Sequence, residues 1–125
     1  MKKGSRTLTE QELEIMKVVW ELGQTTVREV YERLREDRQV AYTTVMTMMN
    51  ILEGKGHLKK EAAGRAYLYE PTKPRQQVIS TLVEDFLDRV FDGAAQPLLL
   101  SLVRDQKVSS QDLDEIAERI EEEEQ

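Results

Sequence analysis

Apolar residues in the first part of the chain recur every three or four positions, the spacing of one face of an α-helix. Thr9 and Glu12 have the spacing of a capping box at the start of a first helix, and Gly23 follows its end. Thr26 and Glu29 repeat that box. Two short amphipathic helices are predicted, with apolar stripes of Leu13, Met16 and Trp20, then of Val27, Val30, Tyr31 and Leu34.

A third helix is predicted from about Tyr42 to Glu53, ending at Gly54 and Gly56. Its inward face is expected to be Val45, Met48, Met49 and Leu52. The opposite face carries Thr43, Thr47 and Asn50, with Thr44 at its edge. Each threonine weakens a helix by a few tenths of a kcal/mol, so this polar, uncharged face is expected to have a binding role.

After the third helix, the period of the apolar positions changes from 3.6 to 2. The segments HLKKE and RAYLYE alternate around Gly64, which predicts a two-stranded hairpin ending at Pro71. The apolar positions of this alternation are Leu58, Ala66 and Leu68, and the tyrosines are a further possibility. Three helices followed by a hairpin are typical of a winged helix-turn-helix domain, whereas a three-helix bundle with a loose loop would not explain the alternation.

The remainder of the chain predicts helices with more apolar surface than they can bury. Residues 74–90 carry a wide apolar stripe, residues 94–103 are apolar nearly all round, and Ser109 with Asp112 caps a last helix. Roughly fifty residues cannot bury this surface alone, so a homodimer is expected. The predicted dimerisation residues are Ile79, Leu82, Val83, Phe86, Val90, Leu98, Leu99 and Leu102. The fold is therefore mainly α with a small β-hairpin: a winged helix over 1–74 and a helical dimerisation domain over 75–125.

The net charge of −6 is unevenly distributed. Residues 1–75 hold 14 Lys and Arg against 11 Asp and Glu, a net +3, and residues 76–125 hold 4 against 13, a net −9. This asymmetry favours a basic half that binds a polyanion. With no cysteine and no long apolar run, a soluble cytoplasmic protein without membrane insertion is expected.

Double-stranded DNA is the predicted partner of the basic half. A helix with a slim, hydroxyl-bearing face can enter the major groove, where Thr and Asn bond to base edges or phosphates. Cations on the following hairpin are placed to contact phosphates. Taken by itself, the threonine pattern also fits a helix face that binds no partner. The predicted DNA-binding residues are Tyr42, Thr43, Thr44, Thr47, Asn50, Lys59, Lys60 and Arg65.

Enzymatic functions find little support in the sequence. The single histidine, His57, has no carboxylate or serine partner nearby in sequence, and GKG at 54–56 lacks the spacing of a phosphate-binding loop. No metal site or cofactor is expected. Two rival functions fit parts of the sequence: a winged helix used for protein–protein assembly, and a regulatory subunit or small hydrolase that binds metal through the acidic residues 121–125.

Several segments together resemble the penicillinase-repressor family, also called BlaI/MecI/CopY. The most specific are AYTTVMT, KG at Lys55 and Gly56, GRAYLYEP, and FDG at 91–93. The resemblance spans nearly the whole chain and implies a dimeric winged-helix repressor that binds a dyad-symmetric operator. It also implies that Thr43, Thr44 and Thr47 belong to the recognition helix and Arg65 to the wing.

Three positions depart from that family pattern. Ile51 stands where members often carry an arginine, which removes one cationic DNA contact. The antibiotic-responsive members are cut by a membrane sensor protease at an Asn-Phe bond, and the matching positions here are Ser101 and Leu102. The copper-responsive branch uses cysteines, which this chain lacks. The resemblance therefore leaves the inducing signal open.

Overall fold

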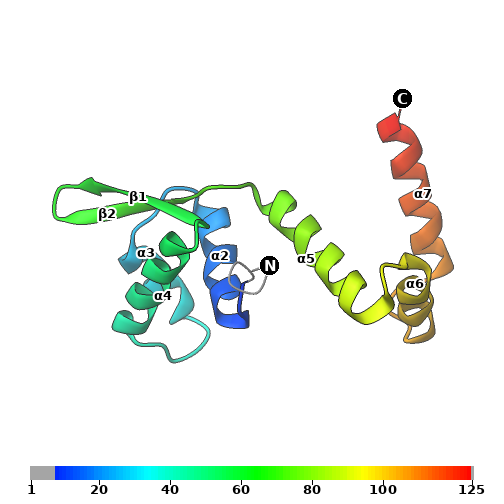
Figure 1. The fold of residues 1–125 in the computed structure, drawn as a ribbon, viewed down its shortest axis with the longest axis horizontal. Coiled ribbons are helices and arrows are strands. Elements are labelled where there is room, and N and C mark those ends of the chain that lie inside the picture. Colours follow the sequence, from blue (N-terminus) through cyan, green and yellow to red (C-terminus); the bar gives the residue numbers. More distant parts are fainter. Residues whose placement is uncertain (1–7, 125) are drawn as a thin grey trace. The chain divides into compact units, whose positions relative to one another are not determined.

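A computed structural model describes residues 8–124 of the chain, which form α-helices where the sequence pattern predicts them and one hairpin (Figure 1). The elements are α2 (Glu10–Leu22), α3 (Val27–Leu34), α4 (Tyr42–Gly54), β1 (Leu58–Ala63), β2 (Ala66–Pro71), α5 (Arg75–Phe91), α6 (Ala95–Arg104) and α7 (Ser110–Glu124). The mainly α fold with a winged helix is confirmed. One compact unit ends at Ser80 and the next begins at Thr81, inside α5; the limits 1–74 and 75–125 stay a prediction.

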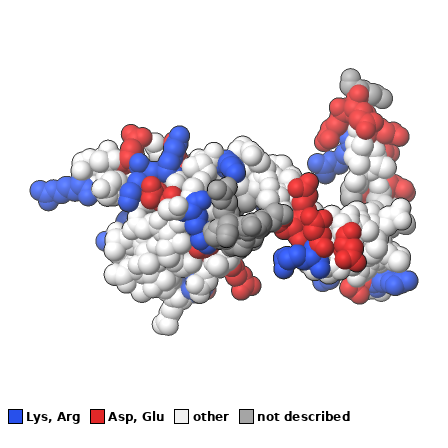
Figure 2. All heavy atoms as spheres, viewed as in Figure 1, with Lys and Arg blue, Asp and Glu red and all other residues white. Residues whose placement is uncertain are grey.

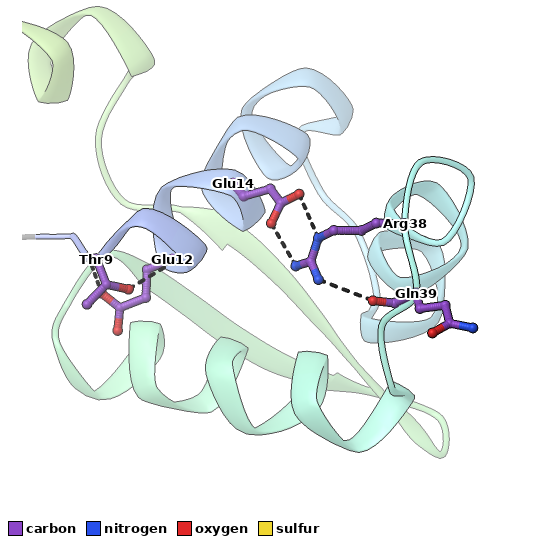
Figure 3. A network of polar contacts seen from close by, with 5 residues as sticks. All are labelled: Thr9, Glu12, Glu14, Arg38 and Gln39. Carbon is purple, nitrogen blue, oxygen red and sulfur yellow. Dashed lines mark hydrogen bonds and ion pairs between the residues drawn. The ribbon is translucent and has the colours of Figure 1, made fainter.

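The three predicted helix caps are all present. The Glu12 amide donates to Thr9 Oγ1 over 3.1 Å, and the Thr9 amide donates to Glu12 Oε1 over 2.9 Å (Figure 3). Thr26 and Glu29 form the same reciprocal pair at the start of α3. The Asp112 amide donates to Ser109 Oγ over 3.0 Å at the start of α7. These bonds satisfy amides that a helix leaves unpaired in its first turn.

The hydrophobic core of the winged helix gathers one face of each of its helices. Its members are Ile15, Met16, Val18, Val19, Val30, Leu34, Val45, Met49, Leu52, Leu58 and Tyr69. In α2 the expected stripe was partly wrong, because Leu13 and Trp20 are only half-buried. Contacts with α3, α4 and β2 bury more of α2 than one stripe. The Trp20 indole N–H instead donates to the Lys73 carbonyl over 3.2 Å.

The hairpin pairs antiparallel from Leu58 opposite Pro71 to Ala63 opposite Ala66, with a two-residue turn. Gly64 begins that turn at φ 66°, a conformation that glycine adopts without strain. The predicted set is confirmed at Leu58 and at Tyr69, one of the tyrosines left open, which are both buried; it is wrong at Ala66, which is exposed, and Leu68 is half-buried. The hairpin extends away from the helices (Figure 1), so only its base can reach the core.

Tyr69 is the buried residue of β2, because this strand also pairs with the segment before α3. The Tyr69 amide donates to the Thr25 carbonyl over 2.7 Å, and the Thr25 amide donates to the Tyr69 carbonyl over 2.9 Å. Thr25 and Tyr69 therefore form an isolated antiparallel bridge. Both residues are buried, at 0% and 2% exposure. The bridge attaches the base of the wing to the connection between α2 and α3.

Three ion pairs connect α2 to other described segments of the winged helix, and the first joins Glu21 to Arg33 of α3. Arg38, in the loop before α4, donates to both carboxylate oxygens of Glu14 over 2.7 and 3.1 Å (Figure 3). Lys55, directly after α4, donates to both oxygens of Glu12 over 2.8 and 3.0 Å. The loop before α4 and the C-terminal end of α4 are thus both joined to α2. Glu12 is 4% exposed, so its carboxylate requires these partners.

The pKa of Glu12 is lowered from its ordinary value of 4.5. Burial by itself raises this pKa, but the hydrogen bonds from Lys55 and from the Thr9 amide, with the charge of Lys55, outweigh burial. A lowered folded-state pKa means that the ionised carboxylate stabilises the fold above the unfolded-state pKa. That stability is lost as the pH falls through the folded-state pKa.

The second unit is helical and has no core of its own among its described residues. α5 ends where Asp92 and Gly93 take positive φ, at 53° and 83°, and the Gly93 amide donates to the Leu87 carbonyl over 2.9 Å. No described residue of α5, α6 or α7 is buried. None of the helices within residues 8–124 has the length and apolar character needed to cross a bilayer.

Replacement of Lys55 by Met tests the pair with Glu12. We expect the free energy of unfolding to fall by about 2 kcal/mol at pH 7, because a buried carboxylate loses a charged donor. The deficit should shrink as the pH falls below 4.5, since protonated Glu12 no longer needs the ammonium. Urea unfolding from pH 3 to pH 7 measures both effects.

The matched control is Lys59→Met, which removes an exposed lysine 3.9 Å from Glu70. Exposed pairs contribute little, so a change below about 0.5 kcal/mol is expected. An equal loss in both variants, or a Lys55→Met deficit that does not depend on pH, would contradict a stabilising role for the buried pair.

Candidate nucleic-acid interface

Burial of one side of α4 turns its opposite side toward solvent. Val45, Met49 and Leu52 are between 0% and 1% exposed, and Met48 is half-buried. The threonines at 43, 44 and 47 and Asn50 are all exposed. The structure therefore places these four predicted residues on one accessible surface. Figure 2 shows few charged atoms over α4 in that view, in keeping with a helix whose only charged residue is Glu53.

The start of α4 is held by aromatic packing, because Ala41 offers no side-chain cap. The rings of Tyr42 and Tyr31 meet edge to face with centroids 5.5 Å apart. The Arg28 guanidinium lies 5.3 Å from the centre of the Tyr42 ring. Tyr42 is thus a packing residue as well as a predicted contact, at 38% exposure.

Cations of α3 lie beside α4 and were missed by sequence reasoning. Arg28 stacks on Tyr42, and Arg35 lies 5.4 Å from the centre of the Tyr31 ring. Both side chains remain more than half exposed, at 67% and 54%. In the sequence they are two of several charged residues in this region, and only the packing of α3 against α4 shows that Arg28 meets Tyr42 at the start of α4.

Asn50 joins α4 to the wing. The Tyr69 hydroxyl donates to Asn50 Oδ1 over 3.0 Å, and the Lys60 ammonium donates to the same oxygen over 3.2 Å. Lys60 also lies 4.7 Å from the centre of the Tyr67 ring. Burial raises the pKa of Tyr69, so its hydroxyl stays a donor at neutral pH. Two predicted DNA contacts, Asn50 and Lys60, are therefore held against each other by the fold.

The other wing cations differ in their surroundings. Lys59 is 3.9 Å from Glu70 and its side chain is 68% exposed. Arg65 is exposed and occupies the second position of the two-residue turn. Figure 2 shows Lys and Arg atoms over the hairpin, including its tip. The arrangement offers positive charge on an arm that extends beyond the body of the winged helix.

A shallow hollow lies along the α2 side of the threonine surface. Three threonines and a glutamine line it together with the apolar side chains of Met48 and Ile51. Ile51 is 43% exposed. Sequence reasoning did not include Gln11 at this surface, since it belongs to another helix. The lining residues are Gln11, Thr43, Thr44, Thr47, Met48 and Ile51.

The predicted dimerisation residues lie on the accessible sides of α5 and α6. Four of them are well exposed: Val83, Phe86, Val90 and Leu99, at 40% to 53%. The other four, Ile79, Leu82, Leu98 and Leu102, are half-buried. Exposed apolar residues outside that prediction are Leu100, Val103, Ile116 and Ile120. Within residues 8–124, no three Asp, Glu, His or Cys side chains are grouped so as to hold a metal ion.

Comparisons with known proteins agree on one family. The family model for the penicillinase repressor matches residues 8–122. The penicillinase repressor of Bacillus licheniformis is 27% identical over 115 residues, which are 92% of this chain and 90% of that protein. The transcriptional regulator BlaI of Mycobacterium tuberculosis is 37% identical over 79 residues, 62% of this chain and 57% of its own.

A solved structure supports the fold of the first unit. The solution structure of the DNA-binding domain of the repressor BlaI superposes with a TM-score of 0.51 at 31% identity. The match covers 54% of this chain and 83% of that domain. The part of this chain that matches is thus about as long as a winged-helix domain.

Replacement of Tyr69 by Phe tests the link between α4 and the wing. The substitution removes only the hydroxyl that donates to Asn50, so we expect the free energy of unfolding to fall by about 1 kcal/mol. Tyr67→Phe is the matched control, because Tyr67 is 50% exposed on the same strand and should be neutral within about 0.5 kcal/mol. Thermal unfolding of both variants measures the difference; equal stability would show that the bond contributes nothing.

Proposed function

The chain belongs to the penicillinase repressor family, and from this premise we propose that it binds a dyad-symmetric DNA operator as a homodimer and represses transcription by occupying it. The family is one of transcriptional repressors and not of enzymes. The observation that carries the proposal is the exposed face of α4, which combines three threonines and Asn50 beside a basic wing.

The chemistry of this face suits a major groove. Threonine and asparagine are short enough to let the helix approach the base edges, and their polar groups can pair with those edges or with phosphates. The predicted base-edge contacts are Thr43, Thr44 and Thr47. Asn50 would present the part of its amide that Tyr69 and Lys60 leave accessible.

Cations on both sides of this face support phosphate contacts. Arg65 lies on the wing, Arg28 lies in α3, and Arg35 caps the C-terminal end of α3. Arg28 and Arg35 also each form an exposed ion pair with Glu32. Contacts with phosphates supply affinity and orient the recognition helix, but they carry no sequence information directly. We therefore assign base selection to α4 and general affinity to these arginines and to Lys59 and Lys60.

The apolar surfaces of α5, α6 and α7 support the homodimer. Their described residues include no buried side chain, yet eight large apolar residues are well exposed. Surfaces of this kind mark protein interfaces. In a symmetric dimer the same patch on each chain would cover the other. Two recognition helices would then enter major grooves about one helical turn apart, or a multiple of it, on a dyad-symmetric site.

Relief of repression by a membrane sensor protease stays a prediction of the family resemblance. The matching positions, Ser101 and Leu102, lie within α6, and Leu102 is half-buried. Cleavage of a peptide bond inside a helix requires that the helix opens locally. A protease acting there would therefore depend on opening of α6.

Operator preference tests the role of α4. We first select bound duplexes from a random pool and then compare the winning operator with a scrambled duplex. Thr47→Ala should lose roughly 1 kcal/mol or more of that preference, because one base-edge contact is removed. A wild-type protein that binds both duplexes equally would contradict the proposal and favour a protein–protein module. Unchanged preference in the variant would remove Thr47 from the base contacts.

Arg65→Ala provides the contrasting variant in the same titration. It should weaken binding to both duplexes alike and reduce the slope of log affinity against log salt by about one unit. Arg119→Ala, an exposed arginine of α7, should leave the slope unchanged. An unaltered slope in Arg65→Ala would argue against a phosphate contact at the wing.

Sedimentation tests the homodimer separately from DNA binding. We expect the wild-type chain to sediment as a dimer at micromolar concentration and Val90→Asp to shift toward monomer, because a charge would be buried in an apolar interface. Asp88→Asn, two residues away on α5, removes a charge from an exposed position and should leave the dimer intact. A monomeric wild-type chain would contradict this part of the proposal.

A further inference from the structure

Ile51 lies on the exposed side of α4, beside Met48 and several polar residues. It is one turn beyond Thr47 along the helix, and the two side chains line the same hollow with Thr44 and Gln11. Its side chain is 43% exposed, more than either Tyr42 or Met46, the other large apolar residues exposed on this helix. Tyr42 is explained by its packing on Tyr31 and Arg28.

The major groove offers an apolar partner for this residue. Each base pair presents hydrogen-bonding groups there, and thymine adds the C5-methyl group. A branched aliphatic side chain cannot pair with the hydrogen-bonding groups and would leave them unsatisfied if it covered them. Its favourable contact is therefore with a thymine methyl. The threonine methyl groups beside it would extend the same apolar strip.

We propose that Ile51 is a specificity-determining residue that contacts the C5-methyl group of one thymine in each operator half-site. The inference rests on the proposed DNA-binding function and adds the base that this position selects. Thymine should be preferred there over uracil, which differs from it only by lacking that methyl group. The position should be distinct from the bases contacted by Thr43, which lies two turns earlier on the helix.

Substitution of single thymines tests this contact. Each thymine of the selected operator is replaced in turn by deoxyuridine, and affinity is measured at fixed salt for the full chain and its variants. The wild-type protein should lose about fourfold in affinity at one thymine per half-site, the effect of one buried methyl group. Ile51→Ala should bind the thymine and uracil duplexes equally at that position, while losing affinity for the unmodified operator.

Met46→Ala is the matched control, because Met46 is a comparably exposed apolar residue of α4, at 39%, outside the hollow. It should keep the uracil penalty at the position assigned to Ile51. Alanine favours helix at an exposed site, so both variants should fold, and thermal unfolding verifies this.

Three outcomes would overturn the inference. In the first, the wild-type protein would prefer the operator to a scrambled duplex but would show no uracil penalty. In the second, the penalty would persist in Ile51→Ala. In the third, Met46→Ala would abolish the same penalty. Each leaves the proposed repressor function standing. Equal binding of operator and scrambled duplex by the wild-type protein would overturn that function, and this inference with it.

Discussion

Packing of one face of α4 against the core is the constraint on which the interface depends. Val45, Met49 and Leu52 are buried against α2, α3 and the base of the hairpin, so the rotation of α4 about its own axis is set by tight packing. A rigid helix with one face buried must expose the other. The threonine surface is therefore a direct consequence of core formation, and a change in the core would turn or tilt the surface as well.

Polar contacts then hold the ends of α4 in place. Lys55 joins its C-terminal end to Glu12 of α2, and Tyr31 with Arg28 packs against its first residue. Asn50 joins its outer side to Tyr69 of the wing. Phosphate contacts by the wing can orient a recognition helix only if the wing and helix move together. The bond to Tyr69 and the bridge between Tyr69 and Thr25 supply that connection.

The two units differ in how much apolar surface they bury. The winged helix buries eleven apolar residues and has a core of its own, whereas α5, α6 and α7 bury none of their described residues. Association would give the second unit the burial it lacks and would join two DNA-binding domains in one molecule. Two linked domains bind more tightly than either alone when both sites can be engaged together. The acidic charge of this half would also keep it from competing for the polyanion.

The sequence by itself determined the local features: three capping boxes or caps, the two faces of α4, the hairpin turn at Gly64, and the excess of apolar surface after Pro74. These depend on residues a few positions apart, so their spacing predicts them. Only the tertiary structure decided that α2 buries Ile15 and Val19 more fully than Leu13, that Ala66 is exposed, and that Arg28 adjoins α4. It also decided the pairs Glu12–Lys55 and Thr25–Tyr69 and the place of Gln11 and Ile51 in one hollow. Such contacts join residues that are distant along the chain, and their partners are set by how the helices pack rather than by any local pattern.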